Sequence, residues 1–151
     1  DLSVCAAGCY VCGDMTLRRR RPGLVYPVNE DWHYVGEAGE PAFENSWVYS
    51  GAGPHPAFRM REAGIVDIQG SIKSGSSHAF TLPLAYRPAG NTSVTCLGLK
   101  SVSGTTLSLA ADVAILTDGK VYPAVNVDGD TAPSYLYFGS AQFFLDPATA
   151  P

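Results

Sequence analysis

Short alternations of apolar and polar residues begin near residue 31 and recur along the rest of the chain. An alternation with a period of two residues is typical of strands with one buried face. Runs with the longer period of an amphipathic helix are missing, while glycine and proline recur between the alternating segments. We therefore expect strands over residues 31–36, 43–50, 64–73, 78–83, 92–99, 105–116, 120–125 and 134–145.

Turn residues between these segments sharpen the prediction. Asp118-Gly119 lies between two strand-like segments and is the strongest hairpin signal in the chain, because a type I′ turn needs positive φ at both central positions. Gly70 interrupts the segment 64–73 and predicts a β-bulge. Short strands at roughly 8- to 14-residue spacing predict an all-β fold, an antiparallel β-sandwich of the jelly-roll or lectin-like kind. We expect its core to contain Trp47, Ile65, Ile68, Phe80, Leu82, Val113, Ile115, Phe138 and Phe143, with Phe43 on the same strand face as Trp47.

Residues 1–31 differ from the remainder of the chain. They hold three of the four cysteines and the basic run Arg18 to Arg21, and no apolar period is sustained in them. We interpret residues 1–31 as an N-terminal arm that attaches the protein to a neighbour, and residues 32–151 as the β-sandwich domain.

The composition limits the classes of function. The 151 residues are 46% hydrophobic and 16% charged, with a net charge of −4, which fits one globular domain. An acidic balance argues against a protein that binds nucleic acid through its overall charge. No apolar run reaches the roughly 18 residues that a membrane-spanning helix requires. We therefore expect neither nucleic acid nor a membrane among the partners.

The cysteine pattern is the sharpest chemical feature. Cys5, Cys9 and Cys12 follow a C-x3-C-x2-C spacing that leaves three interpretations open. They could bind zinc, with His33 or Cys96 completing a tetrahedral set of ligands. They could form a disulfide or crosslink within the arm or between copies, or they could share no ligand at all. We interpret Cys96, which lies in a strand-like segment, as a small buried apolar residue.

Catalytic patterns are weak in this sequence. The three histidines belong to no metalloprotease-type motif, and no G-x-S-x-G nucleophile motif lies near a candidate base. No constellation assembles a nucleophile, a base and an oxyanion site. We therefore expect a binding or structural protein rather than an enzyme, and no cofactor apart from zinc at the arm cysteines.

Three ordered blocks of residues form a recognisable pattern: Pro41, Ala42, Phe43, Asn45, Trp47 and Val48, then Arg59 or Arg61 with Gly64, Val66 and Gly70, then Phe80, Thr81, Leu82, Pro83, Tyr86, Arg87 and Pro88. These blocks resemble a domain that recurs in tail-fibre, baseplate and other surface proteins of tailed bacteriophages. The resemblance covers roughly residues 32–145, and a later Asp-Gly hairpin accompanies the blocks. Three departures concern residues 50–53, where the family has a glycine triplet, Leu84-Ala85 before Tyr86, and residues 135–144, which resemble the family's ending only loosely.

The resemblance implies a homotrimeric β-sandwich displayed on a virion assembled in the host cytoplasm, where it binds rather than catalyses. Loops at one end of the sandwich would then meet a cell-surface glycan, because sugars stack on aromatic faces. The residues that we predict to contact a glycan, or alternatively the next subunit, are Tyr49, His55, Phe58 and Arg59. A second hypothesis is an architectural capsid-decoration or head-fibre protein that binds no receptor.

Overall fold

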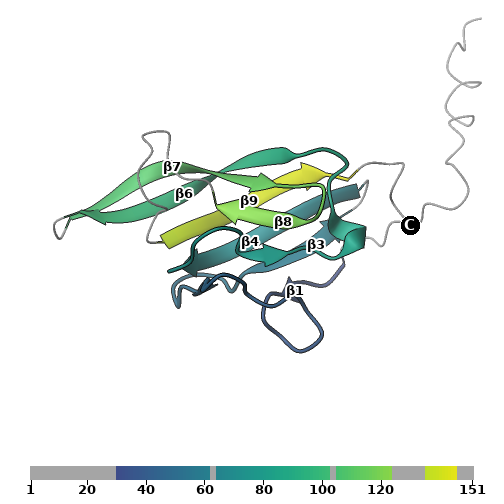
Figure 1. Cartoon of the computed structure of the whole chain (residues 1–151), viewed down its shortest axis with the longest axis horizontal. Coiled ribbons are helices and arrows are strands. Elements are labelled where there is room, and N and C mark those ends of the chain that lie inside the picture. The colour runs from purple at the N-terminus through teal and green to yellow at the C-terminus, as the bar shows by residue number, and fades with distance from the viewer. Residues whose placement is uncertain (1–29, 62–63, 103–104, 124–134, 146–151) are drawn as a thin grey trace, which may run out of the picture.

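The computed structural model describes residues 30–61, 64–102, 105–123 and 135–145 of the chain. Within them every paired strand is antiparallel, which confirms the predicted all-β antiparallel fold class (Figure 1). No helix in these four ranges is long and apolar enough to cross a membrane. The strands are β1 His33–Tyr34, β2 Val48–Tyr49, β3 Ala57–Arg61, β4 Ile65–Lys73, β5 Phe80–Thr81, β6 Thr92–Val102, β7 Thr105–Ile115, β8 Lys120–Pro123 and β9 Tyr135–Phe144, and a 3-10 turn, η2, covers Leu84–Tyr86.

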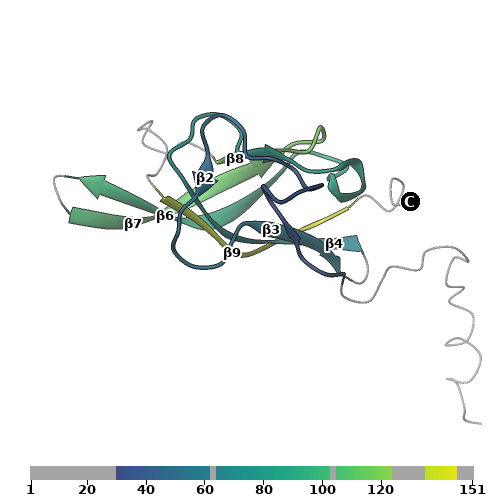
Figure 2. The ribbon, with the colours of Figure 1, turned by 90° about the horizontal axis from the view of Figure 1, so that it is seen from below.

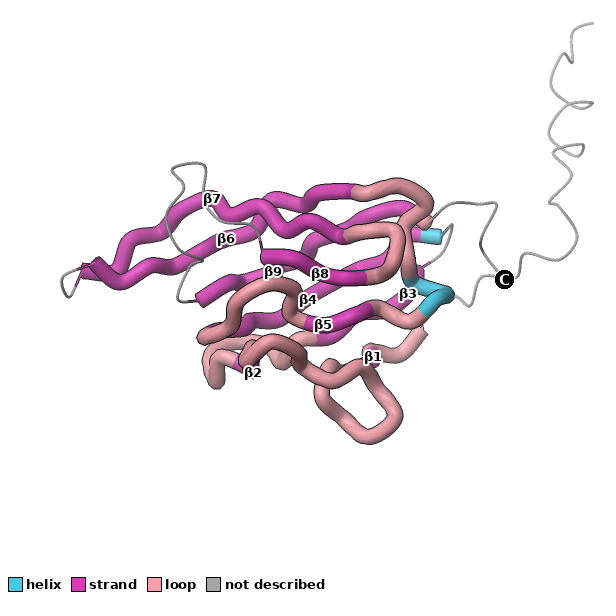
Figure 3. Tube along the Cα trace, in the orientation of Figure 1, coloured by secondary structure: helices cyan, strands magenta, loops and turns pink. Residues whose placement is uncertain are grey.

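The strands form one continuous sheet in the order β1-β3-β4-β9-β6-β7-β8-β5, and β2 pairs with β4 outside this order. The sheet curls so that β8 lies on one side of the molecule and β3 and β4 lie on the other (Figure 2). The long strands form the body of the sheet, whereas β1, β2 and β5 are two-residue pieces joined by long loops (Figure 3). The last strand, β9, lies between β4 and β6 and so joins the two halves of the chain.

The core fills the space inside the curled sheet. Phe58 and Ile68 reach it from β3 and β4, Val113 and Val121 from β7 and β8, and Phe138 from β9. At about 1.5–3 kcal/mol for each fully buried large apolar side chain, this cluster supplies the main drive to fold. The predicted core is confirmed at every position except Ile65, which is only partly buried, and Phe43 packs against the core from its edge.

Two local predictions are confirmed and a third is corrected. The register of β4 against β9 shifts between Gly70 and Ser71, as the expected bulge requires. Asp118-Gly119 does close the β7–β8 hairpin, but only Gly119 has positive φ (89°), so the turn is not type I′. Gly119 N–H donates to Leu116 O at 2.8 Å and Leu116 N–H donates to Lys120 O at 3.0 Å. These bonds fit the longer hairpin loop in which a turn is followed by a left-handed glycine.

The strand expected over residues 43–50 is largely wrong. Asn45 and Ser46 have φ values of 50° and 64°, so the chain turns there, and only Val48–Tyr49 pairs with β4. Trp47 is nevertheless buried, as predicted, and its indole N–H donates to Ser77 O at 3.1 Å. The strand over residues 31–36 likewise shortens to His33–Tyr34.

Candidate functional site

The outer surface of β3, β4 and β9 carries a continuous group of polar side chains. Alternation along β3 directs Phe58 and Met60 into the core, so Arg59 and Arg61 lie on the outer surface. The antiparallel register then places Arg59 opposite Asp67 on β4 and Asp67 opposite Gln142 on β9. Residues more than 80 positions apart in the sequence, such as Arg59 and Gln142, therefore lie on neighbouring strands or one strand apart in the sheet.

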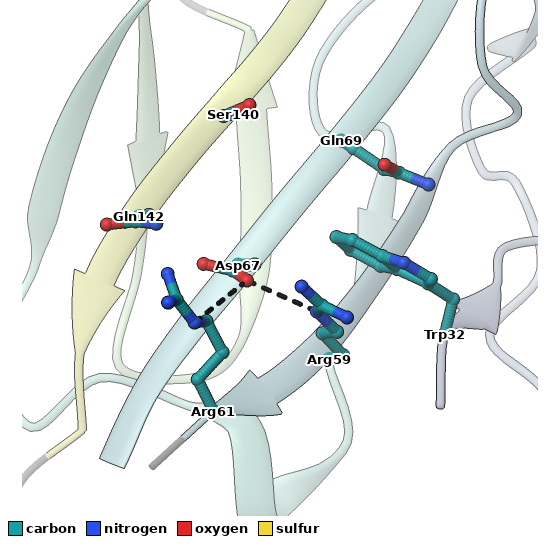
Figure 4. Close-up of a pocket in the computed structure, with 7 residues that line it drawn as sticks. All are labelled: Trp32, Arg59, Arg61, Asp67, Gln69, Ser140 and Gln142. Carbon is teal, nitrogen blue, oxygen red and sulfur yellow. Dashed lines mark hydrogen bonds and ion pairs between the residues drawn. The ribbon is translucent and has the colours of Figure 1, made fainter. Parts of the chain in front are cut away.

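These side chains line a cavity of about 170 Å³ on the outer surface. Figure 4 shows Trp32 and Gln142 at opposite ends of the group, with Asp67 and the two arginines between them. Below, this cavity is called the polar pocket. Its lining residues are Trp32, Arg59, Arg61, Asp67, Gln69, Ser140 and Gln142.

Asp67 is the charged centre of the polar pocket. Its Oδ2 accepts a hydrogen bond from Arg59 Nε at 3.2 Å and lies 3.7 Å from Arg61 Nε. The Asp67 side chain is only 8% exposed, and its Oδ1 is buried without a hydrogen-bond partner among the described residues. A buried carboxylate is costly unless it is paired, so the hydrogen-bonded Arg59 guanidinium is needed to hold it there, and Arg61 adds a longer ion pair. Two cations around one anion leave this part of a net-acidic chain positive.

Trp32 fixes one of these arginines. The Arg59 guanidinium lies 4.3 Å from the centre of the Trp32 ring, within the range of a cation–π interaction. Arg59 is therefore held on two sides, by the ring of Trp32 and by the carboxylate of Asp67. A side chain held in this way loses little conformational entropy when it binds a ligand.

A second group, the aromatic cluster, surrounds His55. The centre of the His55 ring lies 4.7 Å from the ring centre of Tyr49, 5.9 Å from that of Tyr34 and 6.4 Å from that of Phe43. The Tyr49 hydroxyl donates to Gly53 O at 2.7 Å, and the Ser71 hydroxyl donates to Ala52 O. These bonds tie the loop from Ser50 to Pro56 to the body of the sheet, although residues 51–54 themselves are exposed.

A third group connects the first described residue to the fold. Glu30 accepts hydrogen bonds from the Tyr86 hydroxyl (2.6 Å, at Oε1) and from Met60 N–H (2.9 Å, at Oε2). His33 Nε2 lies 3.2 Å from Glu30 Oε1, and His33 Nδ1 lies 2.8 Å from Glu40 Oε1. The His33 ring also stacks on Phe58 with a centre separation of 5.3 Å. Glu30, predicted to belong to the arm, is thus bonded into the domain.

The ionisation of this third group follows from its contacts. Burial lowers the pKa of His33, but hydrogen bonds to Glu40 and Glu30 and their charges raise it by more, so the net pKa lies above the usual value. Burial raises the pKa of Glu30, yet hydrogen bonds from Tyr86, Met60 and His33 together bring it below the usual value. Burial and then Glu30 raise the pKa of Tyr86, which therefore remains a neutral donor.

The four predicted contact residues divide among different environments. Tyr49 and His55 come together in the aromatic cluster, while Arg59 lies in the polar pocket with Trp32 and Asp67. Phe58 is 0% exposed and packs between His33 and Tyr86, so it cannot offer its ring to a glycan or another subunit. That part of the prediction is wrong, because alternation along β3 points Phe58 into the core.

The cysteine predictions have separate outcomes. Cys5, Cys9 and Cys12 lie outside the described residues, so a zinc site or crosslink there stays a prediction. Cys96 is buried, as expected, and burial followed by the charge of Asp112 raises the pKa of its thiol to about 11. A protonated core thiol does not suit the role of fourth zinc ligand. The four described ranges contain no cluster of three residues placed to hold a metal ion.

Most of the polar pocket was not anticipated from the sequence. Asp67 and Gln69 alternate with apolar residues in β4, which marks them as outward-facing, and Arg59 and Arg61 do the same in β3. Nothing local, however, indicates that Ser140 and Gln142 pair beside them. That pairing depends on β9 lying next to β4.

No protein-family model and no curated protein matches this chain. Among solved structures, the crystal structure of the receptor-binding protein of Listeria phage PSA is similar, with a TM-score of 0.52 and 14% sequence identity. The match covers 70% of this chain and 62% of that chain, so this chain spans less than two thirds of that protein. At this identity the likeness concerns the fold, and it accords with the antiparallel architecture described above.

Proposed function

We propose that this chain is a surface domain of a bacteriophage virion, in a tail fibre or baseplate, that binds a saccharide on the host cell. The observation that carries the proposal is a polar pocket, lined by a tryptophan and two arginines, on a fold shared with a phage receptor-binding protein. The three sequence blocks that resemble phage surface proteins support the same assignment.

The chemistry of the pocket suits reversible binding rather than turnover. Saccharides are recognised by planar polar groups that bond to hydroxyls and by aromatic rings that pack on their C–H faces. The pocket offers amides at Gln69 and Gln142, a hydroxyl at Ser140 and the ring of Trp32. The one carboxylate among the lining residues, Asp67, is 8% exposed and bonded to Arg59, which suits a structural role in the pocket. The aromatic cluster of Tyr49 and His55 is a second candidate contact surface.

The proposal includes a homotrimer attached to the virion through residues 1–31. Trimers suit this role because several weak saccharide sites on one particle bind a cell surface jointly, with far greater avidity than one site. The arm has a composition unlike that of the domain, which supports a separate attachment role. The second candidate remains a capsid-decoration protein that contributes only to the architecture of the shell.

Two measurements on the purified full chain separate these candidates. We expect binding to an array of bacterial cell-wall fragments and defined glycans, and competition by the same free saccharides. A silent array, together with binding to empty capsids that is lost when residues 1–29 are deleted, would establish the architectural alternative and reject the receptor-binding proposal. The deletion stops before Glu30, because Glu30 is bonded to Tyr86 and Met60 of the domain.

A further inference from the structure

The polar pocket holds more guanidinium donors than its own carboxylate uses. Asp67 Oδ2 contacts the Nε atom of both Arg59 and Arg61, at 3.2 and 3.7 Å. Within the described ranges, the terminal nitrogens of these two arginines form no hydrogen bond or ion pair. The two terminal nitrogens of each guanidinium form an edge with two parallel N–H donors. This edge is therefore available to bind a ligand.

This open edge selects a particular kind of acceptor. Two parallel N–H donors match the two oxygens of a carboxylate or phosphate, and the resulting charge-assisted bonds are about twice as strong as neutral ones. Arg61 is 43% exposed and Arg59 is 26% exposed at the side chain, so both can be reached from solvent. Figure 4 shows the two side chains converging on Asp67, which fixes their inner edges.

The rest of the pocket is neutral and hydrogen-bonding. The register places Gln69 opposite Ser140 and Asp67 opposite Gln142, so three uncharged polar side chains lie beside the two arginines. Amides and hydroxyls both donate and accept, as recognition of sugar hydroxyls requires. With a volume of about 170 Å³, the pocket is smaller than those that enclose drug-sized ligands. It suits one unit of a longer chain that continues over the surface.

We infer that the polar pocket binds an acidic saccharide, namely a polyhydroxylated chain that carries a phosphate or a carboxylate. The anion lies on the terminal nitrogens of Arg61 and Arg59, and the hydroxyls bond to Gln69, Ser140 and Gln142. Asp67 acts as a positioning residue, because it orders both guanidinium groups without being exposed itself. The inference rests on the proposed saccharide-binding function and adds the class of ligand.

Calorimetric titration of the full chain with three defined probes tests the inference. The probes are trigalacturonic acid, which carries carboxylates, a short glycerol-phosphate oligomer, which carries phosphates, and neutral maltotriose. We expect at least one acidic probe to bind about tenfold or more tightly than maltotriose, with an affinity that falls as salt is raised. Preference for one acidic probe identifies the anion that the pocket recognises.

Substitution of one arginine provides the decisive comparison. Arg61→Gln keeps a polar side chain at a half-exposed position and removes the charge. We expect it to weaken binding of the acidic probe by about tenfold or more. The melting temperature should fall only slightly, because Asp67 keeps its hydrogen bond from Arg59 Nε at 3.2 Å and loses only the longer ion pair at 3.7 Å. Lys120→Gln is the matched control, because it removes one positive charge at the start of β8, outside the residues that line the pocket, and should leave the affinity unchanged.

The outcomes separate this inference from the proposed function. If maltotriose binds as tightly as the acidic probes, or if Arg61→Gln binds like the unmodified chain, the acidic-saccharide assignment is overturned while saccharide binding stands. If no saccharide binds on the wider glycan array, the proposed function itself fails.

Discussion

His33 lies between two carboxylates, and this arrangement makes the stability of the domain depend on pH. Both ring nitrogens face acceptors, Glu40 at Nδ1 and Glu30 with Tyr86 at Nε2. The doubly protonated ring can donate at both positions, whereas the neutral ring can donate at only one. The folded protein therefore holds this proton more tightly than the unfolded chain, in keeping with the raised pKa of His33.

The sign of the effect follows from linkage between folding and proton binding. Because the folded-state pKa is raised above the usual 6.5, the contribution of His33 is complete below about pH 6.5 and declines as the pH rises through the folded-state value. Glu30 acts in the opposite sense. Because its pKa is lowered in the folded protein, Glu30 contributes stability above its usual pKa of 4.5, and this stability is lost as the pH falls.

We expect the unfolding free energy of the native chain to exceed that of His33→Gln at pH 6, and this difference to shrink towards pH 8.5. Urea unfolding of both proteins across this range measures it, and a difference independent of pH would contradict the assignment.

The Tyr86 hydroxyl makes a second, separable contribution in the same group. It donates to Glu30 Oε1 at 2.6 Å from a nearly buried position. Since a hydrogen bond to a charged group contributes about 1.5–3 kcal/mol, Tyr86→Phe should lower the unfolding free energy by about that amount. Tyr122→Phe is the control, because the Tyr122 hydroxyl bonds to no residue in the part of the chain that the structure describes, and it should change stability by less than about 0.5 kcal/mol. Chemical denaturation at pH 7 compares the two, and equal losses would mean that the Glu30 bond contributes little.

Burial of single residues could be predicted where an apolar side chain repeats with a clear period. Trp47, Phe80 and Val113 are buried as predicted. The aromatic ring of Phe58 suggests a contact with a glycan, but Phe58 and Met60 alternate with two arginines and so belong to the core face of a strand. The contacts of Asp67 could not be predicted, because they depend on which strands pair with β4.

The segment between β4 and β5 is shaped by a close contact between a loop and the core. A side chain at Gly75 would place its Cβ 2.1 Å from the ring of Trp47, which is only 2% exposed and cannot move aside. Gly75→Ala should therefore force the loop away from the ring and lower the unfolding free energy by about 1–3 kcal/mol, the usual effect of overpacking.

Gly90→Ala is a matched control for this substitution. A Cβ at Gly90 meets no atom within 4 Å, so the change should be neutral or slightly stabilising. Thermal melts of the two variants beside the native chain provide the comparison. Similar melting temperatures for Gly75→Ala and the native chain would show that the loop moves away from Trp47 without a loss of stability.

The long strands were more predictable than the short ones. The alternation in residues 64–73, 105–116 and 134–145 persists over many residues, and each segment forms a strand with nearly those limits. Residues 43–50 contain aromatic residues at the same spacing, but Asn45 and Ser46 form a turn instead. A few alternating residues do not distinguish a strand from a loop whose aromatic side chains reach the core.

In the whole molecule, the pocket arises from topology rather than from any local motif. Its residues come from the segment before β1 and from β3, β4 and β9, and they meet because β9 inserts between β4 and β6. Sequence patterns indicate which side chains face outward on each strand, but long-range pairing decides which of them become neighbours. The fold class could therefore be predicted, while the composition of the pocket could not.

The same topology leaves part of the β6–β7 hairpin without a third paired strand among the described residues. β9 pairs with β6 only at residues 97–99, and β8 pairs with β7 only at residues 113–115. The hairpin extends beyond the other labelled strands in Figure 1. Leu97 and Leu107 are 48% and 46% exposed. A two-stranded hairpin is marginally stable by itself, and an open strand edge favours pairing with another chain.

If the chain is a homotrimer, this hairpin is where we expect copies to meet. Sedimentation velocity of the full chain should give a particle of about three times 15.9 kDa, and Leu107→Lys should dissociate it, because a charge buried in an apolar contact is strongly unfavourable. Leu84→Lys changes a residue that is 79% exposed on η2 and should leave the trimer intact. If the native chain is a monomer, the trimer is excluded. If the Leu107→Lys variant is still a trimer, the interface does not lie at this hairpin. Dissociation without loss of the melting transition would show that each β-sandwich folds alone and that the hairpin serves assembly.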